Sequence, residues 1–170
     1  MDKLNNFLPM LLAGVLLSGC YENPGDPRNT PPDLPDPPAP VSVSKLRKEL
    51  KSKGFQTFQY VDEASGDTVI MQQYFLVFLK RGPNRVPLSK EEADSLQALH
   101  LGHLSRMYEQ GFADISGPFG DDGEIRGITI YNTPTQAMAD SLSRLDPLVQ
   151  MGRLQTEVHP WWAAKGFPLR

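Results

Sequence analysis

The sequence of 170 residues has one cysteine, no long apolar run and little excess charge of either sign. A single cysteine has no partner for a disulfide within the chain, so packing alone must hold the fold. The net charge of −3 and the lack of a basic stripe with interleaved aromatic residues argue against a nucleic-acid partner. The longest apolar run, residues 7–17, is shorter than the ~20 residues of a transmembrane helix.

The amino-terminal run is instead typical of a secretory signal. It ends in Leu17-Ser18-Gly19-Cys20, which resembles a bacterial lipobox, where cleavage occurs before a cysteine that carries lipid. We therefore predict a lipoprotein signal peptide over residues 1–19 and lipid attachment at Cys20. Tyr21 stands where an inner-membrane retention aspartate would, which favours an outer-membrane location in the cell envelope. An ordinary signal peptide that contains a thiol is the alternative, since Asp2 offsets Lys3.

Proline dominates the next segment, with eight prolines among residues 21–40. Such a composition cannot bury enough apolar surface to offset the entropy of ordering. We predict that residues 20–40 form an extended, lipid-anchored tether rising ~3.1 Å per residue. A proline motif that binds a partner is the alternative.

A folded extension is expected over residues 41–73. Its helix should run from Lys45 to Lys53, because Ser44 can cap it and Gly54 can end it. A hairpin of two strands should follow, with strands at residues 56–61 and 68–71.

The next strand, residues 74–79, is apolar at every position (YFLVFL). A strand with one solvated face would alternate, so both faces of this one should be covered. Two helices can cover one face, and a second copy of the same sheet can cover the other. The sequence therefore favours a homodimer, although the extension of residues 41–73 is an alternative source of cover.

The capping box Ser89-Lys90-Glu91-Glu92 begins a helix that Gly111 is placed to end. Helical periodicity puts five apolar residues on its buried stripe, namely Ala93, Leu96, Leu99, Leu104 and Met107. His100 and His103 fall in the same stripe, about 60° apart. Two interpretations stay open: satisfied core or interface histidines, or functional ones. A metal pair with His159 as third ligand is geometrically allowed, but no carboxylate motif completes it, and we expect no metal or other cofactor.

A second helix should begin at Thr133-Pro134-Thr135-Gln136 as a capping box with proline in the first turn. Its expected inner face comprises Ala137, Met138, Ser141, Leu142 and Leu145. The helix must stop at Asp146, because Pro147 disfavours the α conformation in the residue before it. Asp146 can cap the next helical turn, and it can also orient a nearby imidazole.

The turn Gly117-Pro118-Phe119-Gly120-Asp121-Asp122-Gly123 joins two strands, and Arg126 follows it. By alternation Arg126 lies on the side of Ile128 and Ile130, where a guanidinium can hold a substrate carboxylate or simply be solvated. Arg81 and Arg85 are weaker candidates for the same role. Trp161 and Trp162 should pack at a barrel end or a dimer seam, with an aromatic pocket wall as the alternative.

The order of these motifs over residues 74–162 resembles the YCII-related family, small proteins of the dimeric α+β barrel type. The resemblance rests on three motifs: HLGHL around His100, the following Gly117-Pro118, and DP-x-V-x-x-G from Asp146 to Gly152. The resemblance implies an α+β, ferredoxin-like βαββαβ fold with an antiparallel sheet over residues 74–163, before a tail of residues 164–170. It also implies that His100 and Asp146 form the active site.

We therefore expect an envelope lipoprotein with an isomerase- or lyase-type proton-transfer site. His100 acts as base or acid, Asp146 orients it, and Arg126, His103 and Gly117 contact a small carboxylate or carbonyl ligand. Two alternatives are kept, a non-catalytic ligand-binding lipoprotein and a structural one with a filled barrel.

Overall fold

The computed structural model describes residues 42–167, so the predictions for the signal peptide, Cys20 and the tether lie outside the described residues. Within these residues nine elements follow in chain order: α1 Val43–Ser52, β1 Thr57–Val61, β2 Thr68–Arg81, α2 Lys90–Glu109, β3 Ala113–Pro118, β4 Ile125–Tyr131, α3 Gln136–Ser143, α4 Pro147–Gln150 and β5 Leu154–Ala164. No helix within the described residues is long and apolar enough to cross a membrane.

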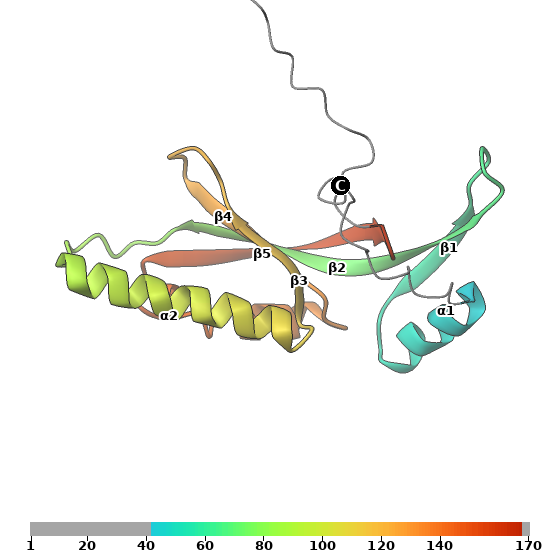
Figure 1. The fold of residues 1–170 in the computed structure, drawn as a ribbon, viewed down its shortest axis with the longest axis horizontal. Coiled ribbons are helices and arrows are strands. Elements are labelled where there is room, and N and C mark those ends of the chain that lie inside the picture. The colour runs from blue at the N-terminus through green and yellow to red at the C-terminus, as the bar shows by residue number, and fades with distance from the viewer. Residues whose placement is uncertain (1–41, 168–170) are drawn as a thin grey trace, which may run out of the picture. The chain divides into compact units, whose positions relative to one another are not determined.

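Strand β2 is the centre of one antiparallel sheet (Figure 1). It pairs with β4 along one edge and with β5 along the other, and β3 pairs with β4. The resulting order β5-β2-β4-β3, with α2 after β2 and α3 after β4, is the ferredoxin-like βαββαβ arrangement. The predicted α+β fold class is thus confirmed, with α4 as an additional turn of helix before β5.

The amino-terminal extension shares the central strand. β1 pairs with residues 68–72 of β2, whereas β4 pairs with residues 75–80 of the same strand. The expected hairpin strand and the expected core strand are therefore one continuous strand, and the predicted boundary at residue 73 lies inside it. α1 begins two residues before the predicted start, and Ser42, not Ser44, caps it by accepting the N–H of Lys45.

The core lies between one face of the sheet and helices α2 and α3. Phe75, Val77 and Leu79 are buried there with Met107 of α2 and Ala139 of α3. Leu76 and Phe78 point to the other face, where they are half-buried. β1 pairs only with residues 68–72, so the hairpin does not extend over these two side chains.

Helix α2 confirms the predicted capping box and only part of the predicted stripe. Ser89 accepts the N–H of Glu92, and Glu92 accepts the N–H of Ser89. The buried residues are His100, His103 and Met107, while Ala93 and Leu99 are exposed. Over residues 91–99 only Leu96 is even half-buried, because the first turns of α2 have little to pack against within the chain.

Helix α3 also differs from its prediction. Thr135 caps it, so Pro134 precedes the cap and does not occupy the first turn. The buried residues are Ala139 and Ser143, whereas Ala137, Ser141 and Leu145 are exposed. The Ser143 hydroxyl donates to the carbonyl of Asp140, which satisfies the serine inside the helix and allows its burial.

Candidate functional site

Two buried residues from different elements meet at the carboxyl end of α3. His100 stands in the middle of α2, and Asp146 follows α3 directly before α4. The Nδ1 atom of His100 lies 2.7 Å from Oδ2 of Asp146. The exposed fractions are 8% for His100 and 2% for Asp146. The pair therefore makes a short contact with little competition from water.

Asp146 is fixed from both sides of its carboxylate. Its Oδ1 accepts the N–H of Leu148 at 2.9 Å, so Asp146 is the N-cap of α4, with Pro147 in the first turn. Its Oδ2 remains for His100. The sequence allowed this residue both to cap α4 and to pair with an imidazole, and the geometry accommodates both at once.

The contact determines how His100 can act. A carboxylate accepts hydrogen bonds and does not donate, so a neutral His100 must carry its proton on Nδ1. The lone pair is then on Nε2. An imidazole held in this tautomer by a carboxylate is the arrangement that general bases use.

His100 also lines a pocket of about 280 Å³ between α2 and the sheet. Four of its wall residues, Gln97, His100, Leu101 and Leu104, follow the i, i+3, i+4, i+7 spacing of one helical face. The other walls are Leu79, Leu148 and Leu154, the backbone around Gly117 and Gly127, and Ile128 and Arg126. Apolar side chains dominate, with Gln97, His100 and Arg126 as the polar groups.

Arg126 lies in the pocket wall, but part of its guanidinium is already bound. Its Nη1 donates to the Asp122 carboxylate at 2.9 Å and to the Asp121 and Gly123 carbonyls at 3.3 Å each. Arg81 binds the same turn through Asp122 and Gly123. The two arginines thus hold the 117–123 turn against β2 and β4. Arg126 supplies a fixed positive charge to the wall, and its Nη1 is not free for a carboxylate.

His103 does not line this pocket and is 1% exposed. Its Nδ1 is 3.4 Å from Nη2 of Arg106, and its buried Nε2 has no hydrogen-bond partner among the described residues. Burial lowers the pKa of His103; the Asp146 charge opposes this shift, and Arg106 and His100 add to it. His103, which was predicted to contact a ligand, is therefore buried outside the wall of this pocket.

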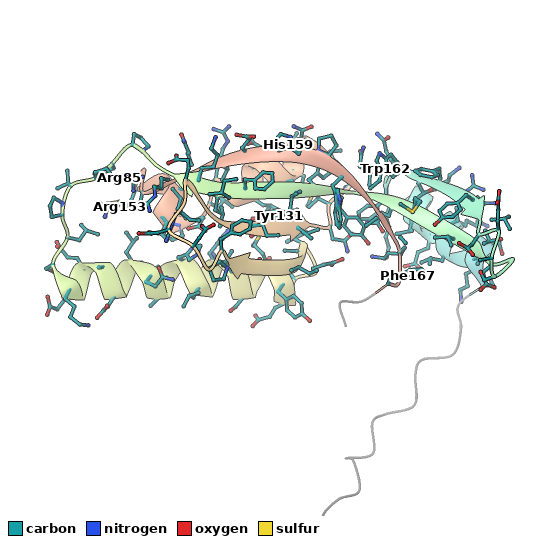
Figure 2. The ribbon with its side chains drawn as sticks, turned by 90° about the horizontal axis from the view of Figure 1, so that it is seen from above. Arg85, Tyr131, Arg153, His159, Trp162 and Phe167 are labelled. Carbon is teal, nitrogen blue, oxygen red and sulfur yellow. The ribbon has the colours of Figure 1, made fainter. Side chains whose placement is uncertain are left out.

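Tyr131, at the end of β4 (Figure 2), was not singled out from the sequence. It is 2% exposed, and burial raises the pKa of its phenol, with the Asp146 charge adding to the shift. Gln97 was missed as well, although its spacing three residues before His100 was a usable signal. Tyr131 gave no such signal, since its proximity to Asp146 depends on tertiary packing.

His159 lies away from the pair, on the side of β5 opposite α2 (Figure 2). Its Nε2 is 2.7 Å from Oε1 of Glu157, whose Oε2 accepts from Lys80 at 2.9 Å. Within residues 42–167 no three His, Cys, Asp or Glu side chains are close enough to hold a metal ion. His100, His103 and His159 therefore do not form a shared ligand set.

The tryptophans and Arg85 occupy other parts of the molecule. Trp161 packs near Tyr74 with ring centroids 6.2 Å apart, and Trp162 packs near Phe58 at 5.0 Å. Both tryptophans stay partly exposed, and neither lines the pocket of His100. Arg85 is exposed in the loop between β2 and α2, and it does not line the pocket either.

Neither family models nor curated proteins match this chain. Among solved structures, the chain is similar to 5-chloro-2-hydroxyhydroquinone dehydrochlorinase from Burkholderia phenoliruptrix, determined with 2,5-dihydroxybenzoquinone. The TM-score is 0.41 at 20% identity, over 52% of this chain and 92% of that one. This likeness is too weak to carry an argument about reaction or ligand.

Proposed function

We propose that the domain is a small-molecule enzyme that moves a proton next to a carbonyl group. The observation that carries the proposal is the 2.7 Å contact between His100 Nδ1 and Asp146 Oδ2 at the wall of a pocket. Among the residues that line this pocket there is no Ser, Thr, Cys or Lys side chain to act as a nucleophile. Proton transfer is the chemistry that a lone, oriented imidazole supports best.

In the proposed reaction Nε2 of His100 removes a proton from the carbon beside a ligand carbonyl. The C–H electrons form an enolate, whose oxygen carries the negative charge. The His100 imidazolium, stabilised by Asp146, then returns the proton to another carbon, or a leaving group departs with its electron pair. The first outcome is an isomerisation and the second an elimination. The fixed charge of Arg126 and the Gln97 amide are the wall groups suited to stabilise the enolate oxygen.

The pocket also limits the ligand. A cavity of about 280 Å³ with mostly apolar walls suits a compact ligand with one or two polar groups. A carbonyl oxygen of the ligand can face the positive charge of Arg126, while the acidic C–H beside it faces the base His100. A small carbonyl compound is therefore favoured over a dicarboxylate, because Nη1 of Arg126 is occupied by the turn.

Deuterium exchange tests this proposal without knowledge of the natural substrate. The protein is mixed in D₂O with a panel of small ketones, enones and keto acids, and loss of the signal of the proton beside the carbonyl is followed by NMR. Exchange above the buffer rate is expected for some member of the panel. It should fall by about 10²-fold or more in His100→Gln.

The matched control is His159→Gln, which removes an exposed histidine outside the pocket and should leave exchange unchanged. Exchange that survives in His100→Gln would contradict the assignment of the base. If ligands bind in the pocket without any exchange, the non-catalytic ligand-binding alternative replaces the enzyme.

We further propose membership of the YCII-related family and a homodimer. Support for the first is the motif order of the sequence together with the ferredoxin-like strand order. Support for the second is the half-buried sheet face that carries Leu76 and Phe78, which no pairing of β1 reaches. A second copy of this sheet would exclude water from these side chains.

The envelope location is also a proposal. It rests on the apolar residues 7–17 and on the lipobox-like sequence that ends at Cys20. Mass spectrometry of the protein from a bacterial envelope fraction tests it. An N-terminal diacylglyceryl cysteine is expected at Cys20, and an unmodified thiol at that position would contradict the lipoprotein assignment.

A further inference from the structure

A basic groove lies at the end of the molecule that the proposed active site does not use. It is formed by α1 together with β1 and the start of β2, and its volume is about 680 Å³. Figure 1 shows α1 beside β1, at the opposite end of β2 from α2. Three cationic residues, Arg47, Lys48 and Lys51, line the groove, and none of its lining residues is acidic.

Positive charge is concentrated in this one helix and its cap. Residues 43–53 carry five cations and one carboxylate, a net charge of +4, whereas the whole chain has −3. The rest of the chain therefore carries −7. Glu49, the one carboxylate, accepts a hydrogen bond from Lys53 at 2.6 Å, and this contact lowers the pKa of Glu49. The cations that line the groove thus face no acid from their own helix.

Arg47, in the wall of the groove, has an N–H group without a hydrogen-bond partner among the described residues. Arg47 donates from Nη1 to Oε1 of Gln59 at 3.0 Å, which positions the guanidinium against β1. Its Nε is buried and has no partner among the described residues. An N–H of a cation left without an acceptor costs free energy.

The hairpin turn between β1 and β2 carries three acidic residues, Asp62, Glu63 and Asp67. The carboxylate of Asp62 accepts the N–H groups of Ala64 and Ser65 and the Ser65 hydroxyl, so it closes the turn. Glu63 and Asp67 are exposed in the same turn. None of these three carboxylates lines the groove.

Apolar side chains stand among the cations. Val43 lines the groove and is 37% exposed, and Val61 is 60% exposed. Val61 shares its face of β1 with Gln59, another lining residue, because alternate residues of a strand point the same way. Lysines and arginines around short apolar tips are typical of surfaces that lie on a membrane interface.

We propose that the groove and outer face of α1 dock on the anionic phospholipid surface of a bilayer, with lipid phosphates held by Arg47, Lys48 and Lys51. The choice of a lipid surface rests on the proposed lipid anchor. α1 is the first described element after the proline-rich segment that follows Cys20, so the anchor would hold this helix within a tether length of the bilayer. Docking would fix the orientation of the domain on the membrane, with the pocket of His100 at the far end of β2.

The test uses vesicle flotation of the full chain carrying Cys20→Ser, so that no lipid anchor contributes. Binding to vesicles of phosphatidylcholine alone is compared with binding to vesicles that also contain phosphatidylglycerol. We expect stronger partitioning to the anionic vesicles, and we expect high salt to remove the difference. The triple variant Arg47→Gln, Lys48→Gln, Lys51→Gln should reduce the preference at least ~10-fold, since each cation near an anionic surface contributes.

The matched control is Arg85→Gln, Lys90→Gln, Arg144→Gln, which removes three exposed cations from elsewhere in the chain. Glutamine has nearly the helix propensity of lysine, so α1 should persist in the test variant, which circular dichroism verifies. Equal binding to both vesicle types would overturn the proposal, as would equal losses in the two triple variants. Binding to polyglutamate but not to anionic vesicles would also overturn it, in favour of an acidic protein partner.

The design separates this inference from the anchor on which it rests. A missing lipid on Cys20 appears in the mass of the envelope protein and leaves the vesicle preference of the Cys20→Ser chain unaffected. If Cys20 carries lipid in the envelope protein but the Cys20→Ser chain shows no preference for anionic vesicles, only the docking proposal is contradicted.

Discussion

At the scale of single residues, Asp146 links local structure to the proposed chemistry. One oxygen caps α4 and the other holds His100, so the same side chain serves the fold and the site. The cap was derivable from the Asp-Pro dipeptide alone. The contact with His100 was implied only by the family resemblance, because a separation of 46 residues leaves no periodic signal in the sequence.

Substitution of Asp146 should separate these two roles. Asp146→Ala loses the cap and the buried contact and should lower the free energy of unfolding by about 2–4 kcal/mol. Asp146→Asn retains an oxygen for the Leu148 N–H and should cost about 1 kcal/mol less than alanine. Urea denaturation measures both. Deuterium exchange should nevertheless fall in both variants, since asparagine cannot hold the same tautomer of His100. Equal losses of stability in Asp146→Ala and Asp146→Asn would show that the cap of α4 does not contribute to stability.

His103 offers a test by pH. Burial lowers its pKa in the folded state, so the unfolded chain binds more protons as the pH falls below the unfolded value near 6.5. The free energy of unfolding should therefore be largest above that value and decrease as the pH falls through the folded pKa. His103→Leu also removes a buried nitrogen without a partner.

We expect His103→Leu to reduce the loss of stability between neutral and mildly acidic pH. The reduction should be up to about 1.4 kcal/mol for each pH unit by which folding lowers the pKa of His103. Urea unfolding of the wild type and the variant at several pH values gives the difference. Parallel pH profiles would contradict the assignment of a depressed pKa to this histidine.

At the scale of elements, local signals predicted the caps of α2 and α4, but not those of α1 and α3. The capping box at Ser89 and the cap at Asp146 are interactions within four residues, so the sequence contains everything they need. The buried faces of α2 and α3 depend on which parts of each helix the sheet reaches. Leu99 is exposed and Ser143 is buried for this reason, against their hydropathy.

The close approach of β3 and β4 is an element-scale feature that depends on glycine. A Cβ added at Gly127 would lie 2.6 Å from the carbonyl oxygen of Gly117, in the neighbouring strand. Gly127→Ala should therefore push the two strands apart and lower the free energy of unfolding by about 1–3 kcal/mol. Gly117→Ala is the matched control, because a Cβ there meets nothing within 4 Å. Similar denaturation midpoints for the two variants would contradict the close packing.

At the scale of the whole molecule, one face of the sheet carries apolar residues that no helix covers among the described residues. The uniformly apolar residues 74–79 predicted cover on both faces, and the helices α2 and α3 cover one. Leu76 and Phe78 remain half-buried on the other. The proposed cover is a second copy of the chain, and a single sequence indicates such a contact only through apolar residues that the fold itself does not bury.

Analytical ultracentrifugation should show a dimer for the wild type. Phe78→Asp should shift it to a monomer, because a carboxylate cannot be buried in an apolar interface without a partner. Leu99→Asp, which changes an apolar residue of α2 that is 58% exposed, is the control and should remain dimeric. A monomeric wild type would rule out the second copy as the cover of the sheet.

The ¹⁵N spectrum of His100, recorded about two pH units above the usual imidazole pKa, tests directly whether Asp146 holds His100 as a base. We expect a protonated Nδ1 and an unprotonated Nε2 in the wild type, and a change of this tautomer in Asp146→Asn. An unprotonated Nδ1 in the wild type would show that Asp146 does not hold His100 as a base.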